Sequence, residues 1–566
     1  MDLTLIAVVG VSSIVAVAAL SKRLGLAAPL VLVVVGIALS FLPWVPDVDV
    51  EPELILAVVL PPLLYSAAVS MPAQDFRRNF KAISGLAVLL VVVTTAGTGL
   101  LFHLLIPDIG WATAFALGAV VSPTDAVAAT SVGRKLGLPS RLLTVLEGEG
   151  LVNDASALVL LRSAVAAMAG AVSLWHVAGD FVYSVIVATV IGALVGVIGV
   201  RVRGWVNDTV LNTALSFVVP FVAFVPVEEL EASGVLAVVV CGLVTGHLAP
   251  RYLKAQHRIG EEMNWHTVAF LLESAIFLIM GLSLEHLVDE VQDSGLSVGE
   301  AVLFGLIASV FVIAARMIFV IPLVAVLKRD ERRAAARIPR LERWQAGLDR
   351  LAEDDAVDDR RRFHIERRVN RASADADFLV SEKLGWRGGV VLAWSGMRGA
   401  ITLAAAQTLP EDTPYRAELI LIAFVVAVTT LLLQGSTLPI VIRRVQIPGD
   451  DTDRLRTQYD DLLDELVSAA EEALADEDDT DVVDRVRADG LVGRRADRAR
   501  AQLDPDNDAR REQYLRLRLK SLAAERAALL EARSHGGYSS QTLLTAQRML
   551  DVEEARLEQL QDSTLR

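Results

Sequence analysis

Two carboxylates and an amide lie close together inside an apolar stretch of this 566-residue chain: Glu149, Asp154 and Asn153. The residues on both sides, 142–145 and 155–161, are those of a membrane-spanning helix. A charged carboxylate at membrane depth costs roughly 2–3 kcal/mol or more, so such residues are rare and usually line the path of an ion or a proton. These residue types and their spacing therefore predict a cation site that can also hold a proton.

Other charged residues lie at comparable depth in apolar stretches: Asp125, Glu273, Arg316 and Arg398. An unpaired arginine there is very costly, so Arg316 needs an acidic partner, and Glu149 is our candidate. This pairing would leave Asp154 free for a transported ion. For Glu273, a pairing with another charge or a local hydrogen bond is favoured over a direct role in transport.

Asp154 is the residue best suited to bind the ion. A carboxylate removed from water can be neutralised by either a proton or a cation, so the two can compete for it. Thr124 could contribute oxygens from its hydroxyl group and its backbone, and Asp125 follows it directly. Asn153 cannot titrate, but it can hydrogen-bond to a neighbouring segment and fix its geometry. The predicted metal ligands are thus Asp154 and Thr124.

The elements that must position these residues are membrane helices. The chain is 53% hydrophobic with a mean hydropathy of +0.48, and apolar runs of about 18 or more residues fill positions 1–445. We predict an all-α polytopic membrane protein whose transmembrane domain covers these positions. Hydropathy gives about 13 helices, near 3–20, 29–45, 53–70, 82–106, 111–131, 141–168, 177–200, 209–226, 233–248, 264–287, 300–327, 388–408 and 415–443.

Positive charges indicate the orientation in the membrane. Basic residues mark alternate breaks between the predicted helices, as at Arg77, Arg78, Arg134 and Arg141, whereas the intervening breaks are mostly neutral or acidic. The positive-inside rule then places the N-terminus outside the cell and the C-terminus in the cytoplasm. An odd number of helices gives the same result. We expect a multi-pass protein of the plasma membrane, embedded in its lipid bilayer.

Two stretches are charged rather than apolar. The break at 328–387, between the eleventh and twelfth helices, carries mixed charges at helical spacing, which indicates solvated cytoplasmic helices. Residues 446–566 form a helix-prone cytoplasmic tail with periodic leucines. A solvated helical appendage is favoured over a regulatory domain as the interpretation of this tail.

Two of the predicted membrane helices contain residues that interrupt helices. The fifth contains Pro123, and the twelfth contains Gly396 and Gly399. If the fold consists of two inverted six-helix repeats, both are the fifth helix of their repeat, and matched interruptions point to the substrate site of a transporter. Each interruption carries one charge, Asp125 or Arg398, that can offset the partial charge of a half-helix end.

Five segments resemble motifs of the monovalent cation/proton antiporters of the NhaP and eukaryotic sodium/proton exchanger type: residues 60–65 (LPPLLY), 122–125 (SPTD), 149–154 (EGLVND), 316–322 (RMIFVIP) and 396–399 (GMRG). The resemblance implies a homodimer of 13-helix protomers with crossed broken helices and a core domain that moves against a dimerisation domain. It also implies that Asp154 binds the proton or the cation, that Asn153 supports it, and that Glu149 pairs with Arg316.

The same resemblance implies that one monovalent cation is exchanged for one proton, because a single aspartate preceded by asparagine is the electroneutral pattern of the family. Na⁺ is the expected ion, with a K⁺/H⁺ antiporter as the alternative and Li⁺ also open. Two departures from the family leave the ion undecided. Many members have a serine where this chain has Gly150, and some carry an acid near Ser66.

Functions of other kinds are less well supported. An organic-anion permease could use Arg398 to bind a carboxylate, but buried acids oppose an anion site. An ion channel would not need a titratable carboxylate at its centre, and the context of Asp125 and Asp154 is not that of an intramembrane aspartyl protease. The sequence shows no ATP-binding loop, metal-ligand cluster or nucleic-acid-binding signature. We therefore expect no enzyme activity, no cofactor and no nucleic acid partner.

Overall fold

The structure is a computed structural model that describes residues 3–24, 27–43, 51–106, 108–170, 174–292, 296–353, 359–475, 483–484, 486 and 508–564. Within these residues all regular secondary structure is helical, which confirms the predicted all-α class. Nine of the described helices are long and apolar enough to cross a membrane, and shorter apolar helices accompany them. The number of thirteen transmembrane helices and the inverted repeats stay predictions.

One group of helices, which we call the scaffold bundle, comes from two separate parts of the chain. It contains α1 (Leu3–Leu24), α2 (Ala28–Ser40), α3 (Pro52–Leu54), η1 (Ile55–Val59), α4 (Leu60–Ser70), α10 (Leu174–Trp205), α11 (Thr209–Glu229), α12 (Gly234–Tyr252) and α13 (Ala255–Leu282). Small residues allow close packing between them. A Cβ atom on Gly36 of α2 would lie 2.9 Å from the Cα of Gly281 on α13, so the two backbones meet directly.

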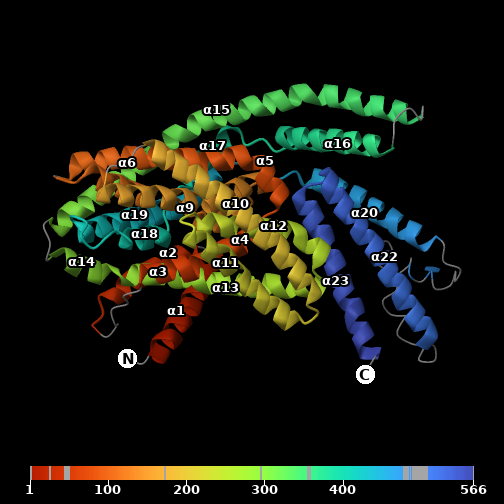
Figure 1. The fold of residues 1–566 in the computed structure, drawn as a ribbon, viewed down its shortest axis with the longest axis horizontal. Helices are drawn as coiled ribbons and strands as arrows, with labels where there is room; N and C mark the ends of the chain where they lie inside the picture. The colour runs from red at the N-terminus through yellow and green to blue at the C-terminus, as the bar shows by residue number, and fades with distance from the viewer. Residues whose placement is uncertain are drawn as a thin grey trace.

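The remaining membrane helices form a second group, the broken-helix bundle. It contains α5 (Ala73–Ser84), η2 (Gly85–Leu90), α6 (Val91–Leu105), α7 (Trp111–Val121), α8 (Val127–Lys135), α9 (Ser140–Ala169), α15 (Val298–Glu353), α17 (Gly385–Trp394), α18 (Ala400–Gln407) and α19 (Arg416–Val445). Fully buried apolar side chains such as Leu117, Val145, Val391 and Leu419 fill its core. The short helix α14 (Leu284–Gln292) packs against members of both bundles. Figure 1 shows α6, α9, α15 and α19 running along the long axis of the molecule.

The chain leaves the helical conformation at both positions predicted from the sequence. Residues 122–126 separate α7 from α8, and residues 395–399 separate α17 from α18. Pro123 removes a backbone donor in the first interruption, and Gly396 and Gly399 weaken the second. The two interruptions touch, because the backbone N–H of Asp125 donates to the carbonyl of Met397 at 2.7 Å.

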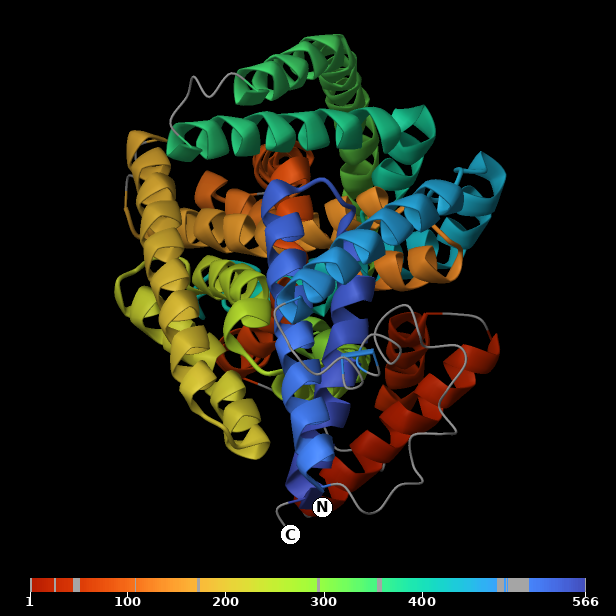
Figure 2. The ribbon, with the colours of Figure 1, turned by 90° about the vertical axis from the view of Figure 1, so that its right-hand side faces the viewer.

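Further helices extend from one end of the two bundles. Helix α15 continues past the predicted end of its membrane span at residue 327 as far as Glu353, and α16 (Asp359–Ser381) packs back along it. The tail contributes α20 (Thr452–Leu474), α22 (Asp508–His535) and α23 (Ser540–Thr564), which share a core of buried leucines. Seen from this end, α22 and α23 lie across the middle of the molecule (Figure 2).

The sequence favoured a solvated appendage as the interpretation of the tail. In the structure the tail is instead docked onto both bundles. Its helix α23 packs against α13 of the scaffold bundle, and Asp551 of α23 forms a buried ion pair with Arg258. On the other bundle, Ser540 donates to Asp75 at 2.6 Å, and Arg78 donates to the carbonyl of Gly536 at 2.7 Å. The mixed-charge sequence of the tail carries the partners for these contacts, and hydropathy does not reveal them.

Candidate ion-binding site

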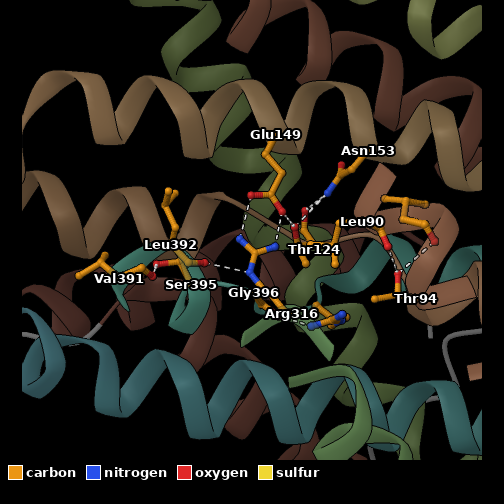
Figure 3. A network of polar contacts seen from close by, with 12 residues as sticks. Leu90, Thr94, Thr124, Glu149, Asn153, Arg316, Val391, Leu392, Ser395 and Gly396 are labelled. Carbon is orange, nitrogen blue, oxygen red and sulfur yellow. Dashed lines mark hydrogen bonds and ion pairs between the residues drawn. The ribbon is translucent and has the colours of Figure 1, made fainter. Parts of the chain in front are cut away.

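A buried ion pair occupies the centre of the broken-helix bundle. Arg316 of α15 is fully buried, and its Nη2 donates to Oε2 of Glu149 on α9 at 2.8 Å, while Nη1 donates to the other carboxylate oxygen. The Nε of Arg316 donates to the carbonyl of Leu392 at 2.9 Å, near the end of α17. Figure 3 shows this two-pronged contact. Such a pair compensates both charges, because the guanidinium fork matches the carboxylate.

Thr124 joins this pair to the first interruption. Its hydroxyl group donates to Oε1 of Glu149 at 2.7 Å. The side-chain amide of Asn153 in turn donates to the carbonyl of Thr124 at 2.6 Å and to its hydroxyl oxygen at 3.0 Å (Figure 3). Since Glu149 and Asn153 are four residues apart on α9, one face of this helix holds the interruption in place through two side chains. In this arrangement the carbonyl oxygen of Thr124 accepts one hydrogen bond, and its hydroxyl group both donates and accepts one.

The charged residues of the interruptions lie at half-helix ends whose partial charges they oppose. The carboxylate of Asp125 accepts a hydrogen bond from the N–H of Val127, at the start of α8, at 2.8 Å. Arg398 donates from Nε to the carbonyl of Val121 at the end of α7, at 3.1 Å, and from Nη1 to the carbonyl of Gly396. An acid at a helix start and a base at a helix end are both stabilising. Arg316 has the same relation to the end of α17.

Asp154 lies in the same buried region but has no hydrogen-bond or ion-pair partner among the described residues. Its side chain is 7% exposed, and its charge interacts with that of Asp125. The side-chain oxygen of the neighbouring Asn153 is also buried and without a partner. A buried polar oxygen without a donor is unfavourable unless water or a cation satisfies it. A carboxylate without a partner and, on the preceding residue of α9, an amide oxygen without a donor are groups that can bind a monovalent cation.

Three other positions singled out in the sequence take different places. Glu273 of α13 has neither a hydrogen bond nor an ion pair within the described residues, so the favoured local pairing is absent, although its charge interacts with that of Asp125. Ser66 is buried on α4, and no hydrogen bond joins its side chain to this cluster in the part that the structure describes. Gly150 packs against the interruption, because a Cβ atom there would lie 2.9 Å from that of Ala126.

Comparison with known proteins decides the family. Residues 10–444 match the family model for the transmembrane domain of sodium/hydrogen exchangers. This chain belongs to the sodium/hydrogen exchanger family. An uncharacterised Na⁺/H⁺ exchanger of Mycobacterium tuberculosis is 29% identical over 97% of this chain and 95% of its own length.

Two further comparisons concern the ions and the fold. A sodium, potassium, lithium and rubidium/H⁺ antiporter of Bacillus pumilus is 26% identical over 88% of this exchanger and 70% of its own length. The structure of the sodium proton antiporter MjNhaP1 from Methanocaldococcus jannaschii matches with a TM-score of 0.55, at 15% identity, over 79% of this chain and 99% of that chain. The helical membrane fold is therefore shared with a known antiporter.

Sequence reasoning missed several polar residues around the site of this exchanger. Thr430 of α19 is fully buried, and its hydroxyl oxygen accepts a hydrogen bond from the backbone N–H of Arg398 at 3.1 Å. Thr95 of α6 bonds to Ser122 at 3.0 Å, at the start of the first interruption. Threonine and serine are common in apolar helices, where they usually bond to their own backbone, so their sequence context gives no signal.

Proposed function

We propose that this exchanger carries one monovalent cation, Na⁺ in the first place, in exchange for one proton, and that Asp154 binds the two in turn. The main support is that Asp154 is a buried carboxylate without a partner among the described residues, and that Asn153, the residue before it, has an orphaned amide oxygen. Among the other buried charges, Glu149 is paired with Arg316, Arg398 donates to backbone carbonyls, and Asp125 accepts a hydrogen bond from the N–H of Val127. Glu273 also lacks a partner among the described residues, but it lies on α13 of the scaffold bundle, whereas Asp154 directly follows Asn153, which contacts the first interruption. We therefore assign the substrate to Asp154.

We infer electroneutral exchange from the assignment of both substrates to the one carboxylate of Asp154. A single carboxylate that is protonated on one crossing and cation-bound on the other carries the same charge in both directions. The interruptions support binding as well, because backbone that has left the helix can offer carbonyl oxygens inside a membrane. The protein would be a transporter that works by alternating access between its two bundles, and not an enzyme.

The experiment is a flux assay with the purified full-length protein in liposomes. A proton-sensitive dye is followed while Na⁺, K⁺ or Li⁺ is added, with Asp154→Asn in parallel. We expect added cations to trigger proton flux in the wild type and not in Asp154→Asn. In the Na⁺ and Li⁺ assays, a potassium/valinomycin voltage clamp should leave this flux unchanged. Full exchange by a correctly folded Asp154→Asn protein would refute the proposal.

K⁺/H⁺ exchange is a second candidate. The Bacillus pumilus relative is named for four monovalent cations, including K⁺, which supports a site of low selectivity. Gly150 points the same way, because it contributes no side-chain hydroxyl that could complete a tight shell around the smaller Na⁺. The order of rates among the three ions in the flux assay separates these cases. An organic-anion permease is not supported, since Arg398 already donates to backbone carbonyls.

We also propose a location, an orientation and an assembly. The protein would span the plasma membrane, with the end that carries α16 and the tail in the cytoplasm, because basic residues gather at that end. Residues 1–445 would form the transport domain and 446–566 a cytoplasmic domain. The apolar side chains exposed on α10, among them Ile186, Val190 and Leu194, would face lipid or a second copy in a homodimer. Reporter fusions at each terminus test the orientation, and native mass spectrometry tests the dimer.

A further inference from the structure

A cavity of about 340 Å³ lies between the membrane bundles and the tail, and its polar lining is unusually basic. We call it the basic pocket. Four of its lining residues are Arg77 of α5, His247 of α12, Arg371 of α16 and Arg533 of α22, and its described lining includes no aspartate or glutamate. The hydroxyl-bearing residues Ser70, Ser534 and Ser540 also line it.

The positive charges of the basic pocket are only partly compensated. Arg77 shares the single carboxylate of Asp375 with Arg78, at 2.9 Å and 2.8 Å. Arg371 donates to the backbone carbonyl of Ser534 at 3.1 Å, and Arg533 to the side-chain oxygen of Gln547 at 2.9 Å. Both of these acceptors are neutral, and neither arginine has an acidic partner among the residues that the structure describes.

The uncompensated charges are also close to one another. The charges of Arg371 and Arg533 both act on His247. Burial lowers the pKa of the Arg533 guanidinium, and no described carboxylate offsets that effect. Of these four basic residues, Arg533 is partly buried, whereas Arg77, His247 and Arg371 are exposed. Like charges gathered without a counter-charge repel one another, so the docked arrangement would gain from an anion placed between them.

Two properties of the lining define the class of that anion. Arginine side chains present a planar fork of donors that matches phosphate oxygens. One wall is apolar, formed by Val69, Met71, Leu543 and Leu544, which suits an organic group attached to the phosphate. The volume of the cavity is within the range of about 300–1,000 Å³ that small-molecule sites occupy.

We propose that the basic pocket binds a phosphate ester, held by Arg371 and Arg533, either as a soluble metabolite or as the headgroup of an anionic phospholipid. The pocket lies where the last turn of α4 meets the first turn of α5, at one end of the membrane helices, so both sources are within reach. Its lining comes from the scaffold bundle, the broken-helix bundle and the tail. A bound ester therefore connects all three and stabilises the docked tail.

The test uses the full-length protein, purified in detergent or in nanodiscs, and its thermal unfolding midpoint. The soluble probes are glycerol 3-phosphate and inorganic phosphate, with sodium chloride at equal ionic strength as the reference. The lipid probe compares nanodiscs of phosphatidylglycerol with nanodiscs of phosphatidylcholine. The variant is Arg371→Gln/Arg533→Gln, and the control is Arg340→Gln, an exposed arginine of α15 outside the pocket.

We expect glycerol 3-phosphate, phosphatidylglycerol or both to raise the midpoint of the wild type and of Arg340→Gln. In the double variant the apparent affinity should fall about tenfold or more, because charge-assisted hydrogen bonds are lost. A response to the soluble ester in detergent identifies a metabolite site, and a response to phosphatidylglycerol alone identifies a lipid site.

Two results would overturn the proposal: no response to any probe, or an equal response in the double variant. If the double variant does not fold, Arg371→Gln alone takes its place, since this arginine is exposed. An unchanged response to the probes in that variant would then count against the site. The assay does not depend on transport, so it can fail or succeed separately from the proposed exchange activity.

Discussion

At the scale of single residues, the ion pair between Glu149 and Arg316 imposes the strongest constraint. Both side chains are buried, and removal of one partner leaves a buried charge without compensation, which costs about 3–5 kcal/mol. We expect Glu149→Gln and Arg316→Ala to lower the thermal unfolding midpoint and the folded yield more than they change ion selectivity. Unfolding of the purified variants, followed together with the flux assay, measures both effects.

The control for this prediction is the pair of Arg162 with Glu228. Its arginine side chain is 49% exposed, and exposed pairs contribute only about 0–1 kcal/mol. Arg162→Gln should therefore unfold close to the wild type. Wild-type stability in both Glu149→Gln and Arg316→Ala would show that these two residues do not stabilise each other.

The sequence could predict part of this residue-level picture. Charges in apolar helices are few, so the pairing of Glu149 with Arg316 follows from the cost of leaving either alone. The contact of Gly150 with Ala126 and the orphaned oxygen of Asn153 could not be predicted. Both depend on how α9 crosses the first interruption, and no local pattern specifies that angle.

At the scale of elements, the two interrupted helices depend on each other. Arg398, from the second interruption, bonds to the end of α7, and its backbone is held by Thr430 of α19. We expect Arg398→Met to destabilise the fold, because the buried carbonyls of Val121 and Gly396 lose their donor, at a cost of about 1–3 kcal/mol. Thr430→Val removes one neutral hydrogen bond and should cost only about 1 kcal/mol.

The measurement is the unfolding midpoint of each variant, with the cation dependence of transport recorded on the folded fraction. If Arg398→Met unfolds like the wild type but loses transport, the arginine acts on the ion rather than on the helix end. Our interpretation requires the other outcome, in which Arg398→Met loses stability and its folded fraction keeps the apparent affinity for the cation.

The positions of both interruptions followed from Pro123 and from Gly396 and Gly399, since these residues weaken helices wherever they stand. The length of α15 was not predictable from hydropathy. Beyond residue 327 its sequence is charged but rich in strong helix formers, so the helix continues through Pro339 to Glu353 without an apolar pattern. The docking of the tail escaped prediction for a related reason, because its contacts include ion pairs and hydrogen bonds between residues far apart in the chain.

At the scale of the whole molecule, the junction between the tail and the bundles contains an acid that titrates near neutral pH. Burial, together with the charges of Asp450 and Asp75, raises the pKa of Glu382 to about 7, whereas Arg141 and Arg454 oppose the shift. Because this pKa lies above the ordinary value of 4.5, the protonated form is favoured in the folded state. The docked structure is therefore most stable below about pH 4.5 with respect to this group, and loses stability as the pH rises toward 7.

We expect Glu382→Gln to remove this part of the pH dependence. The neutral amide imitates the protonated acid, so the variant should gain stability relative to the wild type at pH 8 and match it near pH 5. Limited proteolysis of the tail at both pH values measures the docking. An equal change with pH in wild type and variant would assign the dependence to another group.

The tail also joins the two bundles that the proposed mechanism requires to move. On the scaffold side, Arg258 and Asp551 form a pair whose side chains are only 9% and 7% exposed. On the other side, the tail bonds to Asp75 and Arg78 of α5. An element fastened to both bundles resists any motion of one against the other, so transport should be faster when one of these attachments is weakened.

Asp551→Asn should therefore expose the tail to proteolysis and raise the rate of exchange, because it leaves Arg258 without its buried counter-charge. Arg548→Gln is the matched control, since its pair with Glu262 is 68% and 63% exposed and contributes little. The exchanged pair Arg258→Asp/Asp551→Arg should restore docking at least in part if the attachment is electrostatic. A tail that becomes protease-sensitive in Asp551→Asn while the rate stays at the wild-type value would show that docking does not limit the motion of the bundles.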